Sequence, residues 1–131
     1  MKLVAAAIIK NNGKVLIAQR PRADKLSLKW EFPGGKIEKL ETPEEALVRE
    51  IREELNLDIQ ITGHFMNNLY RYETGEIELM CYLAEVTGGE LKLNFHEAAE
   101  WVEKDRLREF EFAPADIKIV DCFCRFSIDQ G

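Results

Sequence analysis

Three glutamates stand at helical spacing in the acidic middle of the chain. Glu50, Glu53 and Glu54 occupy positions i, i+3 and i+4, so an α-helix would place their carboxylates on one face. Hard oxygen ligands clustered in this way are what Mg²⁺ or Mn²⁺ requires. A bound divalent cation offsets the repulsion among the carboxylates and can bind phosphate oxygens at its open positions. The spacing is therefore compatible with metal-dependent chemistry on a phosphorylated substrate.

The same spacing also suits a solvated helix face, on which Arg49 and Arg52 pair with the glutamates. Like charges at i and i+4 cost roughly a few tenths of a kcal/mol on an exposed helix, so such a face is tolerated. The surroundings favour a metal site instead. Gly34 and Gly35 leave a bare backbone beside the carboxylates, and Glu41 follows Gly35 by six residues.

A helix must carry these glutamates, and the sequence predicts one that begins after Thr42. Thr42 suits the N-cap, Pro43 suits the first helical position, and Glu45 can close a capping box. Asn56 follows the last turn, where a left-handed residue is favoured. An apolar stripe at every fourth position would face the core, and it consists of Leu47, Ile51 and Leu55.

The rest of the chain predicts strands around this helix. Residues 2–10 and 14–20 flank a hairpin turn at Asn12-Gly13, and residues 58–72 and 76–86 form a second antiparallel pair. The remaining predicted segments are a loop over 21–29, an extended piece over 30–35, a turn over 88–93, a short strand over 99–104 and a helix over 114–126. We therefore expect an α+β fold in which helices pack on a mixed sheet.

Length and composition predict one domain over residues 1–131. A chain of 131 residues with 46% hydrophobic content is long enough for one proper core. No segment has the length of a membrane span, the N-terminus lacks the regions of a signal peptide, and three cysteines have no framework spacing. We therefore expect a cytoplasmic protein. The net charge of −6 argues against binding to polymeric nucleic acid, but a small phosphorylated ligand remains compatible with it.

Residues 35–57, GKIEKLETPEEALVREIREELNL, resemble the Nudix box, G-x5-E-x7-R-E-U-x-E-E-x-G-U with U aliphatic. The matching positions are Gly35, Glu41, Arg49, Glu50, Ile51, Glu53, Glu54 and Leu57. Asn56 replaces a glycine of the box, and both residue types accept a left-handed conformation. The stretches WEFPGGKIE before the box and FAPAD near the C-terminus resemble the MutT-type branch of the family, which handles nucleoside triphosphates.

This resemblance implies an α/β/α sandwich with a loop–helix–loop box. It also implies hydrolysis of a nucleoside diphosphate linked to a further group, with Mg²⁺ as the cofactor and Mn²⁺ as a substitute. The implied metal ligands are the side chains of Glu50, Glu53 and Glu54 and the carbonyl of Gly34. Glu50 and Glu53 would take part in catalysis, with Glu53 as our choice for the carboxylate that assists the attacking water. The structural residues of the box, which orient these carboxylates, would be Gly35, Glu41 and Arg49.

Four residues outside the helix are expected to contact the substrate, and they are Arg20, Phe32, Lys36 and Asp116. Arg20 and Lys36 would bind phosphates, although Arg20 could equally be a surface strand residue. Asp116 stands where MutT-type enzymes selective for 8-oxo-dGTP carry Asn. An ionised Asp only accepts hydrogen bonds, which suits the N4 amine of cytosine, whereas burial could restore a donor by raising its pKa. Alternatively, Asp116 caps the helix that begins near Pro114.

One position departs from the MutT-type pattern. These enzymes usually place another metal-binding Glu six residues before the tryptophan that Trp101 resembles, and that position is Phe95 here. Glu97 would point to the same face of an extended strand and could substitute as a metal ligand, or the helix carboxylates could suffice. We lean towards partial compensation by Glu97. His96, between them, is expected to be a packed or capped loop residue.

Together these features predict a Mg²⁺-dependent nucleoside triphosphate pyrophosphohydrolase that releases a nucleoside monophosphate and pyrophosphate. CTP, dCTP or modified dCTP is the expected substrate. The alternatives are an 8-oxo-dGTP diphosphatase, a Nudix enzyme for another nucleoside diphosphate derivative, and a non-catalytic sensor, which the intact glutamates disfavour. The expected partner is a small nucleotide, with neither polymeric nucleic acid nor a membrane. A homodimer stays open, because Phe110 and Phe112 could form a dimer contact or belong to the core.

Overall fold

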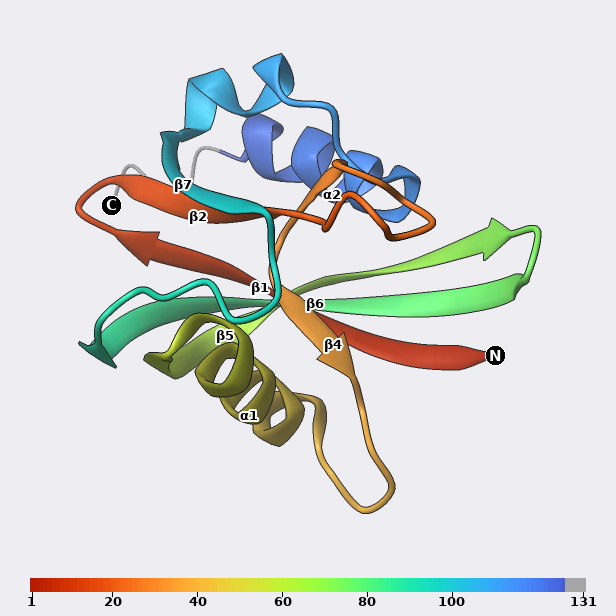
Figure 1. The fold of residues 1–131 in the computed structure, drawn as a ribbon, viewed down its shortest axis with the longest axis horizontal. Coiled ribbons are helices and arrows are strands. Elements are labelled where there is room, and N and C mark those ends of the chain that lie inside the picture. Colours follow the sequence, from red (N-terminus) through yellow and green to blue (C-terminus); the bar gives the residue numbers. More distant parts are fainter. Residues whose placement is uncertain (127–131) are drawn as a thin grey trace.

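One β-sheet crosses the molecule, with α1 on one side and α2 on the other (Figure 1). A computed structural model describes residues 1–126. Its elements are β1 (Lys2–Asn11), β2 (Lys14–Gln19), β3 (Trp30–Glu31), β4 (Gly34–Lys36), α1 (Pro43–Leu55), β5 (Leu57–Tyr72), β6 (Gly75–Gly89), β7 (Ala98–Glu103), the 3₁₀ helix η1 (Lys104–Glu109) and α2 (Pro114–Arg125). The predicted α+β class is confirmed.

The sheet is mixed, as predicted. Its strand order is β3-β2-β1-β6-β5, with β4 also paired to β1 and β7 to β2. Strands β1 and β6 run parallel, from Lys2 opposite Ile77 to Lys10 opposite Glu85, whereas the other strand pairs are antiparallel. The predicted hairpins β1–β2 and β5–β6 are both present. The turn between β1 and β2 uses left-handed φ values of 52° at Asn12 and 79° at Gly13.

Strand β1 lies at the centre and is buried on both faces, which explains its continuous apolar sequence. Alternate side chains of β1 enter two different cores. Ala6 and Ile8 pack on the α2 side, with Leu107, Ile119 and Phe123 among their partners. Ala5, Ala7 and Ile9 pack on the α1 side, against Leu47, Ile51 and Leu55. The α/β/α layering therefore follows from the alternation along this one strand.

Helix α1 begins and ends where the sequence predicts. The Glu45 backbone N–H donates to Thr42 Oγ1 at 3.1 Å, and the Thr42 N–H donates to Glu45 Oε1 at 2.9 Å, which completes the capping box. Asn56 adopts a left-handed φ of 59° and its N–H bonds to the Arg52 carbonyl, so it takes the place of the usual glycine. The face that α1 buries carries the predicted stripe of leucine and isoleucine.

Several local features differ from the predictions. The extended piece over 30–35 is divided at Phe32-Pro33, because the chain passes there from pairing with β2 to pairing with β1. The helix η1 was not predicted, since Leu107 is its one buried residue and gives no period to recognise. Phe112 is buried and Phe110 packs partly buried against the core, which favours the core interpretation of both side chains. Strand β6 extends into the first two residues of the predicted turn and ends at Gly89.

Two further observations concern the redox state of the cysteines and the length of the helices. Within residues 1–126, Cys81, Cys122 and Cys124 are all free thiols, and the last two lie in α2. None of the helices in that described range has the length and apolar character needed to span a membrane.

Candidate active site

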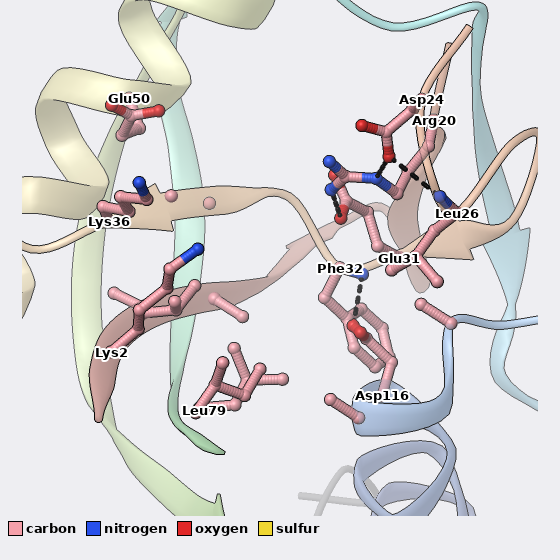
Figure 2. Close-up of a pocket in the computed structure, with 18 of the residues that line it drawn as sticks. Lys2, Arg20, Asp24, Leu26, Glu31, Phe32, Lys36, Glu50, Leu79 and Asp116 are labelled. Carbon is pink, nitrogen blue, oxygen red and sulfur yellow. Dashed lines mark hydrogen bonds and ion pairs between the residues drawn. The ribbon is translucent and has the colours of Figure 1, made fainter. Parts of the chain in front are cut away.

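A cavity of about 740 Å³ opens between α1, β1, β4 and the start of α2. Its size lies in the range usual for small-molecule sites. Of the residues expected from the sequence, the cavity wall includes Arg20, Phe32, Gly34, Gly35, Lys36, Glu50, Glu54 and Asp116. Figure 2 shows Glu50 and Lys36 at one side, with Arg20 and Asp116 across the cavity from them. The fold thus collects residues that are up to 96 positions apart in the chain.

Lys2 also lines this cavity, on the same side as Lys36 (Figure 2). The two lysines come from neighbouring strands, because Val4 of β1 pairs with Lys36 of β4. Neither lysine forms an ion pair with another residue of the described chain, so both charges remain available to an anionic ligand. Lys2 was not selected from the sequence, since only the register of β1 and β4 brings it to the cavity.

Arg49 organises the carboxylates at the start of the box. Its Nε and Nη2 donate to the two oxygens of Glu41 at 2.6 and 2.9 Å, and its Nη1 donates to Glu50 Oε1 at 2.5 Å. The hydrogen bond from Arg49 lowers the pKa of Glu41 to about 2. This geometry agrees with the orienting role expected for Glu41 and Arg49, because the arginine links the loop carboxylate to a carboxylate of α1.

The three glutamates of α1 that are expected to bind metal do not share one environment. The Glu50 side chain is 16% exposed, and both Glu50 and Glu54 line the cavity. The Glu53 side chain is 60% exposed and lies outside the lining residues, with its carboxylate 3.8 Å from Arg49 Nη1. Helical spacing places all three on one side of α1, but of the three only Glu50 and Glu54 line the cavity.

The two glycines before the helix are needed for close backbone approach. A Cβ on Gly35 would lie 2.2 Å from Glu50 Oε2, and a Cβ on Gly34 would lie 1.9 Å from the Ala5 carbonyl oxygen. Both distances are far below van der Waals contact, so a side chain at either position would displace its neighbour. Gly35 therefore keeps the backbone of β4 directly against the Glu50 carboxylate.

Glu54 carries a strongly shifted pKa. Burial raises the pKa of Glu54 to about 7, and repulsion from Glu50 and Glu31 acts in the same direction, whereas His96 and Arg20 oppose it. The folded chain therefore holds this proton more tightly than the unfolded chain does. A divalent cation bound beside Glu54 would replace this proton and stabilise the ionised carboxylate.

This shift predicts a pH dependence of stability without metal. Because the folded pKa of about 7 exceeds the ordinary value of 4.5, the contribution of Glu54 to the free energy of unfolding falls as pH rises between them. In EDTA, the Tm of the wild type should therefore fall relative to that of Glu54→Gln from pH 4.5 to pH 7. Thermal melts of both proteins across this range test it, and parallel curves would contradict it.

The donor set fits a hard divalent cation. Glu50 and Glu54 present carboxylate oxygens to the cavity beside the bare backbone of Gly34 and Gly35, and oxygen is the ligand that Mg²⁺ prefers. Burial is the main cause of the raised pKa of Glu54, so a cation bound beside it would offset the cost of burying its charge. Among residues 1–126, however, no three acidic, histidine or cysteine side chains stand close enough together to form a complete ligand set.

Arg20 is held at the cavity by two carboxylates. Its Nη1 donates to Glu31 Oε1 at 2.7 Å, and its Nε donates to Asp24 Oδ2. Burial disfavours the charge on Arg20, but these two contacts outweigh burial and raise its pKa. The cavity position supports the predicted phosphate contact over an ordinary surface strand residue. Glu31 and Asp24 were not identified from the sequence, because their partners are distant or lie in an irregular loop.

Asp116 is buried at the first turn of α2. Its Oδ2 accepts a hydrogen bond from the Phe32 backbone N–H at 3.0 Å. The side chain therefore links α2 to the segment between β3 and β4 and does not cap its own helix. Burial, assisted by the charge of Glu31, raises the pKa of Asp116 well above its usual value. The start of α2 is fixed further by Tyr72, whose hydroxyl accepts from the Ala115 N–H at 3.1 Å.

The strand geometry predicted for Glu97 is wrong. Strand β7 begins at Ala98, and the chain bends before it, so Phe95 and Glu97 do not alternate along an extended strand. Phe95 lines the cavity, whereas Glu97 is exposed and lies outside the lining residues. His96 is packed, as predicted, and its Nε2 lies 2.8 Å from Glu31 Oε2.

Comparison with known proteins agrees with this fold. A family model described as the NUDIX domain matches residues 1–123. The chain is 37% identical to the CTP pyrophosphohydrolase of Escherichia coli (strain K12) over 121 residues, which cover 92% of this chain and 89% of that protein. It is 35% identical to the 8-oxo-dGTP diphosphatase of the same organism over 118 residues, covering 89% of this chain and 92% of that protein. The solution structure of the E. coli ORF135 protein matches with a TM-score of 0.82 and 35% identity, over 94% of this chain and 89% of that one.

A mixed sheet between helices, with a glutamate-rich helix beside the cavity, defines a hydrolase of the Nudix type. The chain belongs to the NUDIX domain family. The resemblance seen in residues 35–57 is thereby confirmed, and so is the α/β/α sandwich with its mixed sheet.

Proposed function

We propose that the protein hydrolyses nucleoside triphosphates to a nucleoside monophosphate and pyrophosphate, with Mg²⁺ as cofactor and CTP, dCTP or modified dCTP as substrate. The observation that carries this proposal is the division of the cavity into two unlike sides. Figure 2 shows the charged Glu50, Lys2 and Lys36 at one side. The buried Asp116 and Phe32 lie across from them, and Arg20, already paired to Glu31 and Asp24, lies on their side. A nucleotide has the same division between its phosphates and its base.

Glu50, Glu54 and the Gly34 carbonyl, which line the cavity, would hold the cation, and Glu53, which lies outside the lining, would have to turn inward to join them. When bound, the cation polarises the phosphate and lowers the pKa of a bound water. Glu50 is the carboxylate best placed to orient the attacking water, because it lines the cavity and Arg49 fixes one of its oxygens. Lys2 and Lys36 lie on the same side and would bind the phosphate oxygens that leave as pyrophosphate.

At the other side, Asp116 would contact the base edge. Its Oδ2 accepts a hydrogen bond from the Phe32 N–H, and Asp116 lines the cavity, so Oδ1 would be the oxygen that meets the base. An ionised Asp116 accepts only and suits the N4 amine of cytosine. The raised pKa of Asp116 favours a second candidate substrate, 8-oxo-dGTP, because a protonated carboxyl group offers a donor and an acceptor to O6 and N7–H.

The direct test is pyrophosphate release from a nucleotide panel with and without Mg²⁺. The panel contains CTP, dCTP, 5-methyl-dCTP, 8-oxo-dGTP and dGTP, together with ADP-ribose, whose cleavage is followed as AMP because it yields AMP and ribose 5-phosphate and no pyrophosphate. We expect Mg²⁺-dependent release that is fastest from the cytidine nucleotides. Preferred cleavage of ADP-ribose would contradict the triphosphate assignment, and binding without hydrolysis of any member would indicate a sensor.

Replacing Asp116 with Asn should change base selectivity. Asn keeps an oxygen for the Phe32 N–H and adds an NH₂ donor, so the contact to the backbone can persist. We expect the kcat/KM ratio to shift towards 8-oxo-dGTP by about 5- to 150-fold, the scale of one buried hydrogen-bond mismatch of about 1–3 kcal/mol. Competition assays with CTP and 8-oxo-dGTP measure this ratio. Equal slowing of both substrates would show that Asp116 holds the fold and does not contact the base.

A further inference from the structure

His96 is a fully buried side chain directly behind the cavity wall. Its imidazole has 0% exposed surface, and its Nε2 lies 2.8 Å from Glu31 Oε2. An ionised carboxylate only accepts hydrogen bonds, so Nε2 must carry the hydrogen and donate it. Its other ring nitrogen, Nδ1, is buried without a hydrogen-bond partner among the described residues. The ring is therefore fixed through a single polar contact, and that contact is with Glu31.

Glu31 has both of its oxygens occupied. Oε2 accepts from His96, and Oε1 accepts from Arg20 Nη1 at 2.7 Å. A carboxylate engaged in this way from two directions cannot rotate without losing one bond. Since Arg20 lines the cavity, the position of its guanidinium depends on the orientation of Glu31. Asp24 holds the remaining side of Arg20 through Nε.

Burying a polar imidazole nitrogen without a partner is costly, at about 1–3 kcal/mol for a typical group. An apolar side chain of similar size would avoid this cost if packing were the only requirement. The contact with Glu31 gives a reason for an imidazole at this position. The Nε2–H of His96 donates the hydrogen bond that Glu31 accepts. Phe95 packs against the His96 ring edge-on, with centroids 5.0 Å apart, and supports its orientation from the cavity side.

We propose that His96 is a positioning residue of the active site, which fixes the Glu31 carboxylate from behind and thereby aims the Arg20 guanidinium into the cavity. His96 does not touch the substrate. This inference rests on the proposed function, because Arg20 is the residue through which its effect reaches the phosphates. It assigns a role to His96 and Glu31 that neither residue type nor spacing indicates in the sequence.

The variants separate donation to Glu31 from packing. His96→Leu fills the space without a donor, and His96→Gln places an amide donor near the position of Nε2. His96→Asn places its amide near Nδ1, which has no partner. We expect His96→Leu and His96→Asn to raise the KM for CTP about 10-fold with kcat within about 2-fold of the wild type, and His96→Gln to restore KM to within about 3-fold. His64→Gln is the matched control, since His64 is exposed and bonds to Asn67.

A double-mutant cycle tests whether His96 acts through Arg20. In an Arg20→Ala background, His96→Leu should raise KM no further, because the guanidinium that it positions is absent. Additive effects of the two changes on KM would overturn the proposal, as would an unchanged KM in His96→Leu. If His96→Leu fails to fold, Glu31→Gln replaces it in the same cycle with the same expectation. Failure of His96→Gln to restore KM would also overturn it.

A measurement without substrate keeps this inference distinct from the proposed function. In NMR spectra at neutral pH and low temperature, the Arg20 Nη1–H signal, whose donor bonds to Glu31, should be visible in the wild type and in His96→Gln, and lost in His96→Leu through faster exchange. A signal that persists unchanged in His96→Leu would overturn the positioning role. Absence of nucleotide hydrolysis by the wild type would instead reject the proposed function. The NMR measurement would then still test whether His96 positions Arg20.

Discussion

Replacing Glu50 with Gln is expected to lower kcat by about 10³-fold at saturating Mg²⁺, within the range typical of a lost general base. Glu50 lines the cavity, and its side chain is only 16% exposed. Gln keeps an oxygen that can accept from Arg49, so the pair between Arg49 and Glu41 should survive. The loss would then come from the missing charge and basic oxygen.

Steady-state kinetics across a Mg²⁺ titration measure this effect and separate the roles of the glutamates. Glu53→Gln should lower kcat by about 10²-fold, because Glu53 is the ligand or base expected from the box but is 60% exposed. A variant that mainly raises the Mg²⁺ requirement has lost a ligand, whereas one that is slow at every Mg²⁺ concentration has lost the base. Glu44→Gln removes an exposed charge from the same helix and should leave kcat unchanged. Wild-type turnover by Glu50→Gln would rule out its assignment.

Replacing Gly35 with Ala should also be severe, with a fall in kcat/KM of about 10²-fold. The new Cβ would lie 2.2 Å from Glu50 Oε2, so the carboxylate must move away from its place in the cavity. A displacement of about 1 Å at a catalytic group can cost about 10²-fold in rate. The Tm should change little, because the obstacle is the end of a side chain that can rotate.

Gly63→Ala provides the matched control for this change. A Cβ at Gly63 would meet no atom within 4 Å, so this variant should behave as the wild type. In a Glu50→Gln background, Gly35→Ala should cost less than it does alone, because both changes act on one carboxylate. A full additional 10²-fold loss there would show that Gly35 acts on some other part of the site.

Much of the fold could be predicted because its signals are local. The capping box of Thr42 and Glu45, the stripe on α1 and the left-handed Asn56 all lie within fifteen residues of one another. The turn at Asn12-Gly13 is a similar case. Each of these depends on backbone geometry that neighbouring residues determine. The box itself was recognisable for the same reason, since its positions have fixed spacing in one segment.

The remaining features of the site depend on contacts between distant segments. His96 and Glu31 are 65 residues apart, and their bond has no signature in either local sequence. Lys2 reaches the cavity only through the register of β1 with β4. The different exposure of Glu50 and Glu53 also escaped the helical period, because the period gives an angle around α1 and not the depth at which the neighbouring loop covers it.

The segment from Phe32 to Gly35 is the part of the chain that both sides of the cavity share. Phe32 donates its N–H to Asp116 at one end, and Gly35 lies against Glu50 at the other. A fully extended chain advances about 3.3 Å per residue, so three residues allow at most about 10 Å between these contacts, and the bend at Pro33 shortens this span. The length of this backbone segment would therefore fix the distance between the part of the cavity that holds the base and the part that holds the phosphates. A side-chain change can alter which base is accepted. Inserting or deleting a single residue here would instead change the spacing between the two parts, so that base and phosphates could not both occupy their sites.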